Sequence, residues 1–283
     1  MSLPGLAIKG HTFHWGSRTY IMGVINVTPD SFSDGGKFSS PEGAKQQAAS
    51  LIAAGADILD IGGESARPFS EPVTLEEELR RVIPAIREIR KISDCPISVD
   101  TVKAEMAEAA LSEGADIIND ISALRFDPRM ADVASALEAP VILMHMKGTP
   151  RYMQVNPSYE DVVGEVKLFL EKRVTWANSK GIPREKILID PGIGFGKNFH
   201  DNLVLINHLQ EFTELGVPVV VGVSRKAFLG TITGIKEAEE RDVATLGAVA
   251  ASSMRGADLV RVHNVALTRQ VLQVVDAICR ESL

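Results

Sequence analysis

The chain has 283 residues, of which 45% are apolar and 24% are charged, and its formal net charge is −7 at pH 7. This balance is that of an ordinary globular protein and excludes a fibrous or intrinsically disordered chain. The negative net charge argues against a nucleic-acid-binding surface, so an anionic ligand would have to be held by a few individual cations.

Residues 1–19 contain short apolar pieces separated by glycines, and they predict a β-hairpin that closes the bottom of a barrel. No basic segment leads into an apolar one at Met1–Gly5, and no apolar run approaches the length that spans a membrane. Cys95 and Cys279 have neither CxxC nor metal-ligand spacing, which suits free thiols in a reducing compartment. We therefore expect a cytoplasmic protein without a membrane partner.

From Tyr20 onward, short β-branched runs alternate with longer segments of helical spacing, as in Leu75, Leu79 and Val82. The eight predicted strands are Tyr20–Asn26, Asp57–Ile61, Pro96–Val99, Asp116–Asn119, Pro140–Met144, Ile187–Asp190, Pro218–Gly222 and Leu259–Val262. Their regular spacing favours a closed barrel over a long open sheet. Because no linker divides the chain, the sequence predicts one α/β domain over residues 1–283, a (β/α)8 TIM barrel with an N-terminal hairpin.

The segment Ala244–Met254 is apolar and rich in small residues nearly all round. A helix of this kind packs on two sides rather than one. We expect one of these sides to contact a second subunit, which makes the protein a homodimer.

Several predicted strands end on, or run straight into, polar residues that an apolar core would exclude. These residues are Asn26, Asp100, Asn119, Asp190, Lys226, Arg261 and His263. Taken singly they have ordinary explanations, because Asp100 could cap a helix and Asp190 precedes Pro191 in a turn. A ring of them around one end of a barrel predicts a polar ligand, because unpaired polar groups are costly to bury.

The acceptor groups and the cations of this ring lie on different strands. Asp100, Asn119 and Asp190 suit a flat heterocycle with an amidine or guanidine edge, since a carboxylate accepts two parallel N–H bonds. The cations follow the last two strands, where barrels commonly hold phosphate, and a pair such as Arg261 and His263 would serve that purpose. Singly, Lys226 could be a solvated lysine and His263 a structural histidine.

No set of His, Asp and Glu residues has zinc spacing. A metal would therefore be Mg²⁺, held mainly by phosphate oxygens with Asn26 as one neutral ligand.

Eight motifs in this order resemble those of the dihydropteroate synthase family over essentially the whole chain. They are Gly23–Gly36 (GVINVTPDSFSDGG), Asp60–Pro68 (DIGGESARP), Ser98–Thr101 (SVDT), Ile118–Asp120 (IND), Met144–Met146 (MHM), Asp190–Lys197 (DPGIGFGK), Ser224–Lys226 (SRK) and Arg261–His263 (RVH). The resemblance implies a (β/α)8 barrel that condenses 6-hydroxymethyl-7,8-dihydropterin diphosphate with p-aminobenzoate and releases pyrophosphate.

The resemblance also implies which residues bind each substrate. The pterin ring would be held by Asp100, Asn119, Asp190 and Lys226, with Phe195 and Met144 against it. The diphosphate and its Mg²⁺ would be held by Asn26, Arg261 and His263. The arylamine would be covered by Phe32, Arg67 and Pro68. Catalysis would rest on Lys226, Arg261 and His263, which bind the pterin or stabilise the charge that grows on the leaving pyrophosphate.

Three positions depart from the commonest pattern of this family. Ala66 stands where threonine is usual, Phe69 where glycine is frequent, and Ala227 where serine is common. Ala66 removes a hydroxyl expected near the pterin side of its loop, Phe69 stands beside the expected arylamine site, and Ala227 leaves backbone N–H groups to meet the substrate carboxylate. These departures bear on arylamine affinity and sulfonamide sensitivity rather than on the reaction.

Two other functions share part of the motif set. A methyltetrahydrofolate-dependent methyltransferase that works with a corrinoid protein would need the pterin acceptors, but not the diphosphate set or the long first loop. A catalytically silent paralogue would bind pterin without turning it over. The presence of Asn26, Arg261 and His263 favours the synthase over the methyltransferase.

Overall fold

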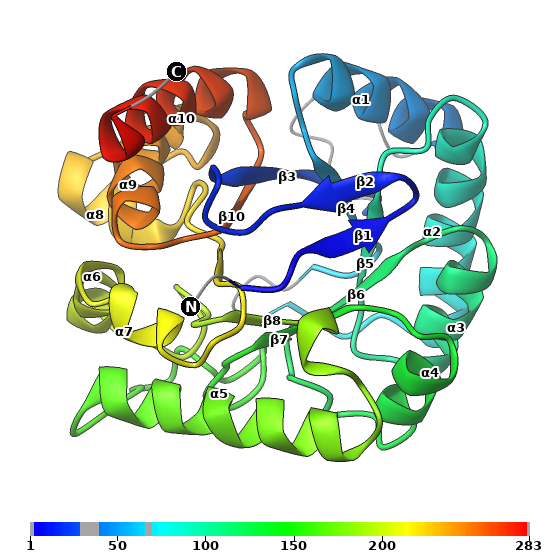
Figure 1. Ribbon diagram of the computed structural model, residues 1–283, viewed down its shortest axis with the longest axis horizontal. Helices are drawn as coiled ribbons and strands as arrows, with labels where there is room; N and C mark the ends of the chain where they lie inside the picture. The colour runs from blue at the N-terminus through cyan, green and yellow to red at the C-terminus, as the bar shows by residue number, and fades with distance from the viewer. Residues whose placement is uncertain (1–2, 29–39, 66–69, 282–283) are drawn as a thin grey trace.

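A ring of eight parallel strands surrounded by helices forms the body of the protein in the computed structural model, which describes residues 3–28, 40–65 and 70–281 (Figure 1). The strands of the ring are β3 (Tyr20–Asn26), β4 (Ile58–Gly62), β5 (Ile97–Asp100), β6 (Ile117–Asp120), β7 (Val141–Met144), β8 (Ile187–Asp190), β9 (Val220–Val221) and β10 (Leu259–Val262). They are mostly apolar and mostly buried on both faces, as expected of parallel strands covered by helices.

The order of the strands closes the ring. Neighbours along the chain pair in parallel from β3 to β8, and β10 pairs with both β3 and β9. A parallel bridge between Ile189 and Val219 joins β8 to the segment that leads into β9. The predicted (β/α)8 barrel is therefore confirmed.

Helices cover the outside of the ring. They are α1 (Pro41–Ala53), α2 (Leu75–Arg90), α3 (Ala104–Ser112), α4 (Met130–Ala136), α5 (Val162–Ser179), α6 (Phe199–Asn207), α7 (Gln210–Thr213), α8 (Ala227–Thr233), α9 (Asp242–Met254) and α10 (Val265–Arg280). Helix α2 shows why these segments are helical: Thr74 caps its first turn, and Val82, Ile86 and Ile89 form a fully buried stripe. None of the described helices is long and apolar enough to cross a membrane.

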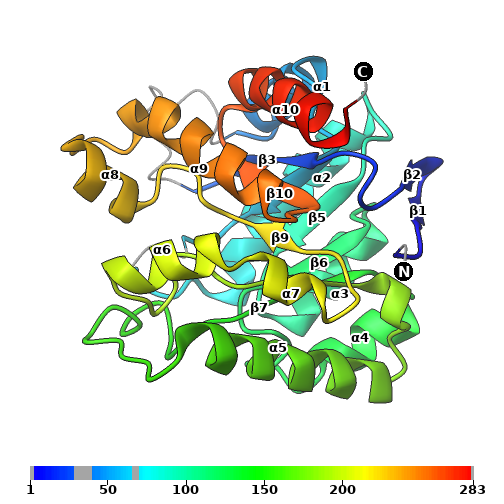
Figure 2. The ribbon, with the colours of Figure 1, turned by 60° about the vertical axis from the view of Figure 1, so that its left-hand side comes forward.

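The predicted N-terminal hairpin is present as β1 (Leu6–Ile8) and β2 (His11–Phe13). Its apolar side chains pack on a layer of residues at the start of the barrel strands, which includes Met22, Ile58 and Leu259. Figure 2 shows the hairpin at one end of the barrel and α8 beyond the other end. The hairpin thus closes the end at which the strands begin, and leaves the opposite end for polar side chains.

Candidate active site

The polar residues predicted from the strand ends lie around one end of the barrel. Asn26 is opposite Gly62 in the strand register, Gly62 is opposite Asp100, and Asp100 is opposite Asn119. Further around the ring, Met144 is opposite Asp190. The structure therefore brings these predicted residues to neighbouring positions at the carboxyl ends of the strands, where barrels of this class carry their active sites.

Arg261 lies at the centre of a buried ion-pair network. Its Nε donates to Asp60 Oδ2 at 2.6 Å, and its Nη2 donates to Asp100 Oδ2 at 2.9 Å. Asp60 is 0% exposed and also accepts from Asn119 Nδ2 at 3.3 Å. Asp100 and Asn119, which are predicted to bind a pterin, and Arg261, which is predicted to bind a diphosphate, therefore belong to a single network. Asp60 joins Asn119 to Arg261 in this network.

Burial and charge within this network shift the pKa values of Asp100 and Arg261. Burial raises the pKa of Asp100 above its ordinary value, although the charge of Arg261 opposes this effect. Burial by itself would lower the pKa of Arg261, but Asp60 and Asp100 raise it above its usual range, so the guanidinium stays charged.

Asp60 was not among the residues predicted to form the site. The signal for it was a carboxylate inside the apolar strand β4, flanked by Leu59 and Ile61. A charge in such a position requires a buried partner. The partner, Arg261, is 201 residues away in the sequence.

Asp190 is fixed by the turn that follows β8. Its Oδ1 accepts from the backbone N–H of Gly192 at 2.7 Å. Gly192 has φ +70°, and a Cβ there would collide with the carbonyl oxygen of His145, so only glycine fits. Burial raises the pKa of Asp190 to about 6, with Gly192 and Lys226 opposing the rise. This carboxyl can therefore accept a hydrogen bond and exchange a proton near neutral pH.

Lys226 lies over an aromatic ring rather than against a carboxylate. Its Nζ is 4.1 Å from the centre of the Phe195 ring. Burial, followed by the charge of Arg261, lowers the pKa of Lys226 to about 8. Phe195 packs with Met144, Met146 and other apolar residues. The predicted Phe195 and Met144 therefore belong to one apolar wall beside Lys226 and Asp190.

A buried lysine that the sequence did not reveal holds this wall in place. Lys197 is 2% exposed, and its Nζ lies 2.9 Å from His145 Nδ1 and 3.0 Å from the carbonyl oxygen of Phe195. Burial lowers the pKa of Lys197 to about 7 and that of His145 to about 2, so His145 is neutral and accepts the hydrogen bond. Lys197 thus fixes the backbone of Phe195 against the end of β7.

His263 is an uncharged hydrogen-bonding group. Its backbone N–H donates to Ser224 Oγ at 3.3 Å, and its Nδ1 lies 2.9 Å from the same hydroxyl. Burial, followed by the charges of Arg225 and Arg261, lowers the pKa of His263 to about 3. The Ser224 hydroxyl can donate to Nδ1, which leaves the imidazole proton on Nε2. The cations of the site are therefore Arg261 and Lys226, while His263 supplies a neutral donor.

The remaining predicted positions lie at the edge of this site or beyond it. Asn26 ends β3 with its side chain partly exposed, and Ala227 is the first residue of α8. Phe32, Arg67 and Pro68 lie outside the described residues, as do Ala66 and Phe69. The arylamine side of the site therefore stays a prediction from the sequence.

No group of three or more His, Cys, Asp and Glu residues that could hold a metal ion occurs in residues 3–28, 40–65 and 70–281. The sequence predicts an ion that takes most of its ligands from the oxygens of a bound diphosphate. The residues fit that arrangement, because Asn26 ends its strand beside the Arg261 network and carries an amide oxygen.

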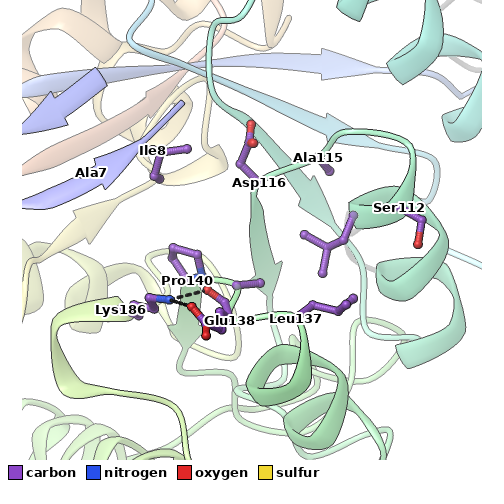
Figure 3. Close-up of a pocket in the computed structure, with 11 residues that line it drawn as sticks. Ala7, Ile8, Ser112, Ala115, Asp116, Leu137, Glu138, Pro140 and Lys186 are labelled. Carbon is purple, nitrogen blue, oxygen red and sulfur yellow. Dashed lines mark hydrogen bonds and ion pairs between the residues drawn. The ribbon is translucent and has the colours of Figure 1, made fainter. Parts of the chain in front are cut away.

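A cavity of about 300 Å³ lies at the opposite end of the barrel, beside β1 (Figure 3). Its charged side chains are paired with other groups of the protein: Lys186 donates to the Glu138 carbonyl oxygen at 2.8 Å, and Asp116 accepts from Arg90 at 2.5 Å. This end of a barrel serves stability, so the chemistry is placed at the other end.

Comparisons with known proteins give a consistent picture. Residues 22–263 match the family described as pterin binding enzyme. A dihydropteroate synthase from Synechocystis sp. is 46% identical, over 98% of this chain and 96% of its own length. A dihydropteroate synthase from Xanthomonas albilineans, solved with 4-aminobenzoic acid, is 45% identical with a TM-score of 0.91 over 98% of each chain. A Yersinia pestis dihydropteroate synthase in complex with a sulfonamide drug is 38% identical with a TM-score of 0.94, over 99% of this chain and 100% of the other.

Proposed function

Because the chain belongs to the dihydropteroate synthase family of pterin-binding enzymes, we propose that the polar ring at the carboxyl ends of its strands is the active site of that reaction. The protein is a transferase of folate biosynthesis that joins 6-hydroxymethyl-7,8-dihydropterin diphosphate to p-aminobenzoate, giving 7,8-dihydropteroate and pyrophosphate. The observation that carries the proposed site is the buried network in which Arg261 contacts both Asp60 and Asp100.

The pterin ring is proposed to lie between Asp100, Asn119 and Asp190, with Lys226 reaching it from the start of α8. The buried carboxylates of Asp100 and Asp190 offer paired acceptors to an amidine edge, and such bonds are strong where water is scarce. The apolar wall of Phe195 and Met144 supports this placement, because a flat ring needs an apolar surface against its face.

The diphosphate is proposed to lie beside β3 and β10, against Asn26, Arg261 and His263. Magnesium, bound mainly by diphosphate oxygens and by Asn26, would supply positive charge to the leaving group. Arg261 adds a permanent cation, and the Nε2–H of His263 adds a neutral hydrogen bond.

The reaction replaces a carbon–oxygen bond by a carbon–nitrogen bond. The arylamine nitrogen forms a bond to the methylene carbon next to the pterin ring, and the carbon–oxygen bond breaks with its electron pair leaving on pyrophosphate. The nitrogen then gives one proton to water. An aromatic amine is neutral at physiological pH, so no strong base has to activate it. Residues that stabilise the departing pyrophosphate therefore contribute more than a general base would. The proposed arylamine residues Phe32, Arg67 and Pro68 would cover the incoming amine.

The sulfonamide complex of the Yersinia pestis enzyme supports a sulfonamide-sensitive arylamine site in this protein as well. The bulk of Phe69, where glycine is frequent, is proposed to alter that inhibition. An unchanged inhibition constant in Phe69→Gly would contradict this proposal.

A homodimer is proposed to form through α9 and α10, which pack side by side. Val243 and Met254 are 76% and 61% exposed, and they lie on one face of α9, about three turns apart. On α10, Val274 and Ile278 are 60% and 67% exposed and occupy neighbouring turns. Exposed apolar side chains on two helices that pack together support an interface with another chain. Helix α9 also contains Ala244–Met254, the segment whose small apolar residues predicted a contact with a second subunit.

Pyrophosphate release from pterin diphosphate, p-aminobenzoate and magnesium tests the proposed site. Lys226→Ala and Arg261→Ala should both abolish turnover, and Arg261→Ala should mainly weaken diphosphate binding. Lys186→Ala, at the opposite end of the barrel, is the matched control and should keep its turnover. Retained activity in either site variant would refute the assignment. A silent paralogue would bind pterin tightly without release, and a corrinoid-dependent methyltransferase would release no pyrophosphate.

A further inference from the structure

The residue before Lys226 has an unusual backbone conformation. Arg225 has φ +61°, in the left-handed region that residues other than glycine, asparagine and aspartate seldom adopt. It connects Ser224, which contacts His263, to Lys226, which lies on Phe195. A residue is held in this conformation only when the surrounding structure fixes it.

The start of α9 and the residue before it hold Arg225 through its backbone N–H, its carbonyl oxygen and its guanidinium. The backbone N–H of Arg225 donates to the buried hydroxyl of Thr245 at 2.9 Å, and its carbonyl oxygen accepts from Arg241 Nη1 at 3.1 Å. The guanidinium forms a two-point ion pair with Asp242, with Nε at 2.8 Å and Nη2 at 3.2 Å from the carboxylate oxygens.

Asp242 also reaches the end of the next strand. Its Oδ2 accepts from Asn264 Nδ2 at 2.9 Å, and Asn264 directly follows His263 and caps α10 by accepting from Leu267. Burial would raise the pKa of Asp242, but Arg225 and Asn264 lower it, so the carboxylate is charged at neutral pH. One carboxylate therefore links the segment that carries Lys226 to the segment that carries His263.

We propose that Asp242 is a positioning residue, which holds Lys226 and His263 in the relative arrangement that one bound pterin diphosphate requires. It contacts neither side chain directly and acts through Arg225 and Asn264. This inference rests on the proposed roles of Lys226 and His263. The hydrogen bonds between Ser224 and His263 also join the two segments, so the loss of Asp242 should weaken the arrangement without abolishing it.

The direct test compares Asp242→Asn with the matched variant Asp276→Asn. Asp276 lies on α10 near its C-terminal end, where it accepts from the backbone of Thr19 and pairs with Arg280, away from the strand ends that carry the site. Misplacement of catalytic groups by about 1 Å reduces rates by up to about 100-fold, so we expect a loss of about 10-fold to 100-fold in kcat/KM for pterin diphosphate in Asp242→Asn. Inhibition by inorganic pyrophosphate should weaken as well. Asp276→Asn should lower the midpoint of thermal unfolding without this kinetic change.

A second pair of variants separates positioning from general stability. Arg225→Asn removes the guanidinium but keeps a residue that tolerates the left-handed conformation. If Asp242 acts through Arg225, the double variant Arg225→Asn/Asp242→Asn should be no slower than the slower of the two single variants. Asp242→Glu, which keeps the charge, should recover part of the lost kcat/KM.

Each outcome decides one question. Parental kinetics in Asp242→Asn, or kinetic losses that merely follow thermal stability in both aspartate variants, would overturn the inference while leaving the proposed function intact. Full turnover in Lys226→Ala or His263→Ala would refute the proposed roles themselves, and the inference would fall with them.

Discussion

Replacing Arg261 by methionine should both destabilise the protein and stop its turnover, because the guanidinium neutralises two carboxylates at the end of the barrel. Asp60 is 0% exposed, and its contact with Arg261 Nε is 2.6 Å. Removing one partner of a buried ion pair costs about 3–5 kcal/mol, since the other charge is left buried and uncompensated. The side chain of Arg261 is itself 25% exposed, so we expect the lower end of that range. For a chain of this length, about 3 kcal/mol corresponds to a fall of about 6 °C in Tm.

Urea unfolding at neutral pH, followed by circular dichroism, measures this loss. Arg129→Met is the matched control, because Arg129 pairs with Glu108 at 3.5 Å with both side chains more than half exposed. Such surface pairs contribute about 0–1 kcal/mol. The double variant Asp60→Asn/Arg261→Met also removes the uncompensated negative charge of Asp60. It should recover at least half of the lost stability, but no activity. A loss below that of the control, or a double variant no more stable than Arg261→Met, would falsify this account of the network.

Three further predictions concern other parts of the molecule. The value of kcat/KM for pterin diphosphate should fall as the pH rises through about 8, where Lys226 loses its proton. In Lys226→Arg this fall should move to higher pH. A pH profile that is the same in both proteins would contradict this prediction. Lys197→Met should raise KM for pterin diphosphate more than KM for p-aminobenzoate, because it removes the hydrogen bond that fixes the backbone of Phe195. Steady-state kinetics with each substrate varied in turn measure both constants. An equal change in both would argue against this role of Lys197. Val243→Asp should give monomers in sedimentation velocity at micromolar concentration, because it places a charged carboxylate on the exposed face of α9. Unchanged sedimentation would exclude this face from the proposed interface.

The barrel could be predicted from the sequence because its strands are short apolar runs bracketed by glycine and polar residues. The bounds predicted for Tyr20–Asn26, Ile187–Asp190 and Leu259–Val262 agree with β3, β8 and β10. The largest difference is at Pro218–Gly222, where only Val220–Val221 form a strand. This segment pairs with β10 over two residues and meets β8 through a single bridge. The apolar pattern of a segment does not indicate over how many residues it pairs with its neighbours.

The site could be predicted only in part, for a physical reason. Polar residues at strand ends stand out against apolar runs, so Asp100, Asn119 and Asp190 were found. Asp60 and Lys197 were missed because their significance depends on burial and on partners that are distant in the sequence. A lysine after a glycine-rich turn is usually solvated, and nothing in its neighbours reveals that its amine is enclosed by His145 and backbone carbonyl oxygens.

In the proposed site, Arg261 belongs both to the buried ion-pair network and to the diphosphate-binding residues, and its two carboxylate contacts differ in their burial. Its Nε is held by Asp60, which is fully buried and therefore cannot be stabilised by water in place of the guanidinium. Its Nη2 is held by Asp100, which lies nearer the open end of the strand and retains some exposure. In the proposed site, a pterin that donates its amidine edge to Asp100 would supply that carboxylate with new hydrogen bonds, so Asp100 would depend less on Nη2 while Asp60 keeps its contact with Nε. Because Asp60 already holds the guanidinium in place, the proposed role of Arg261 would require little reorganisation when charge develops on the leaving group, which is the condition for electrostatic catalysis.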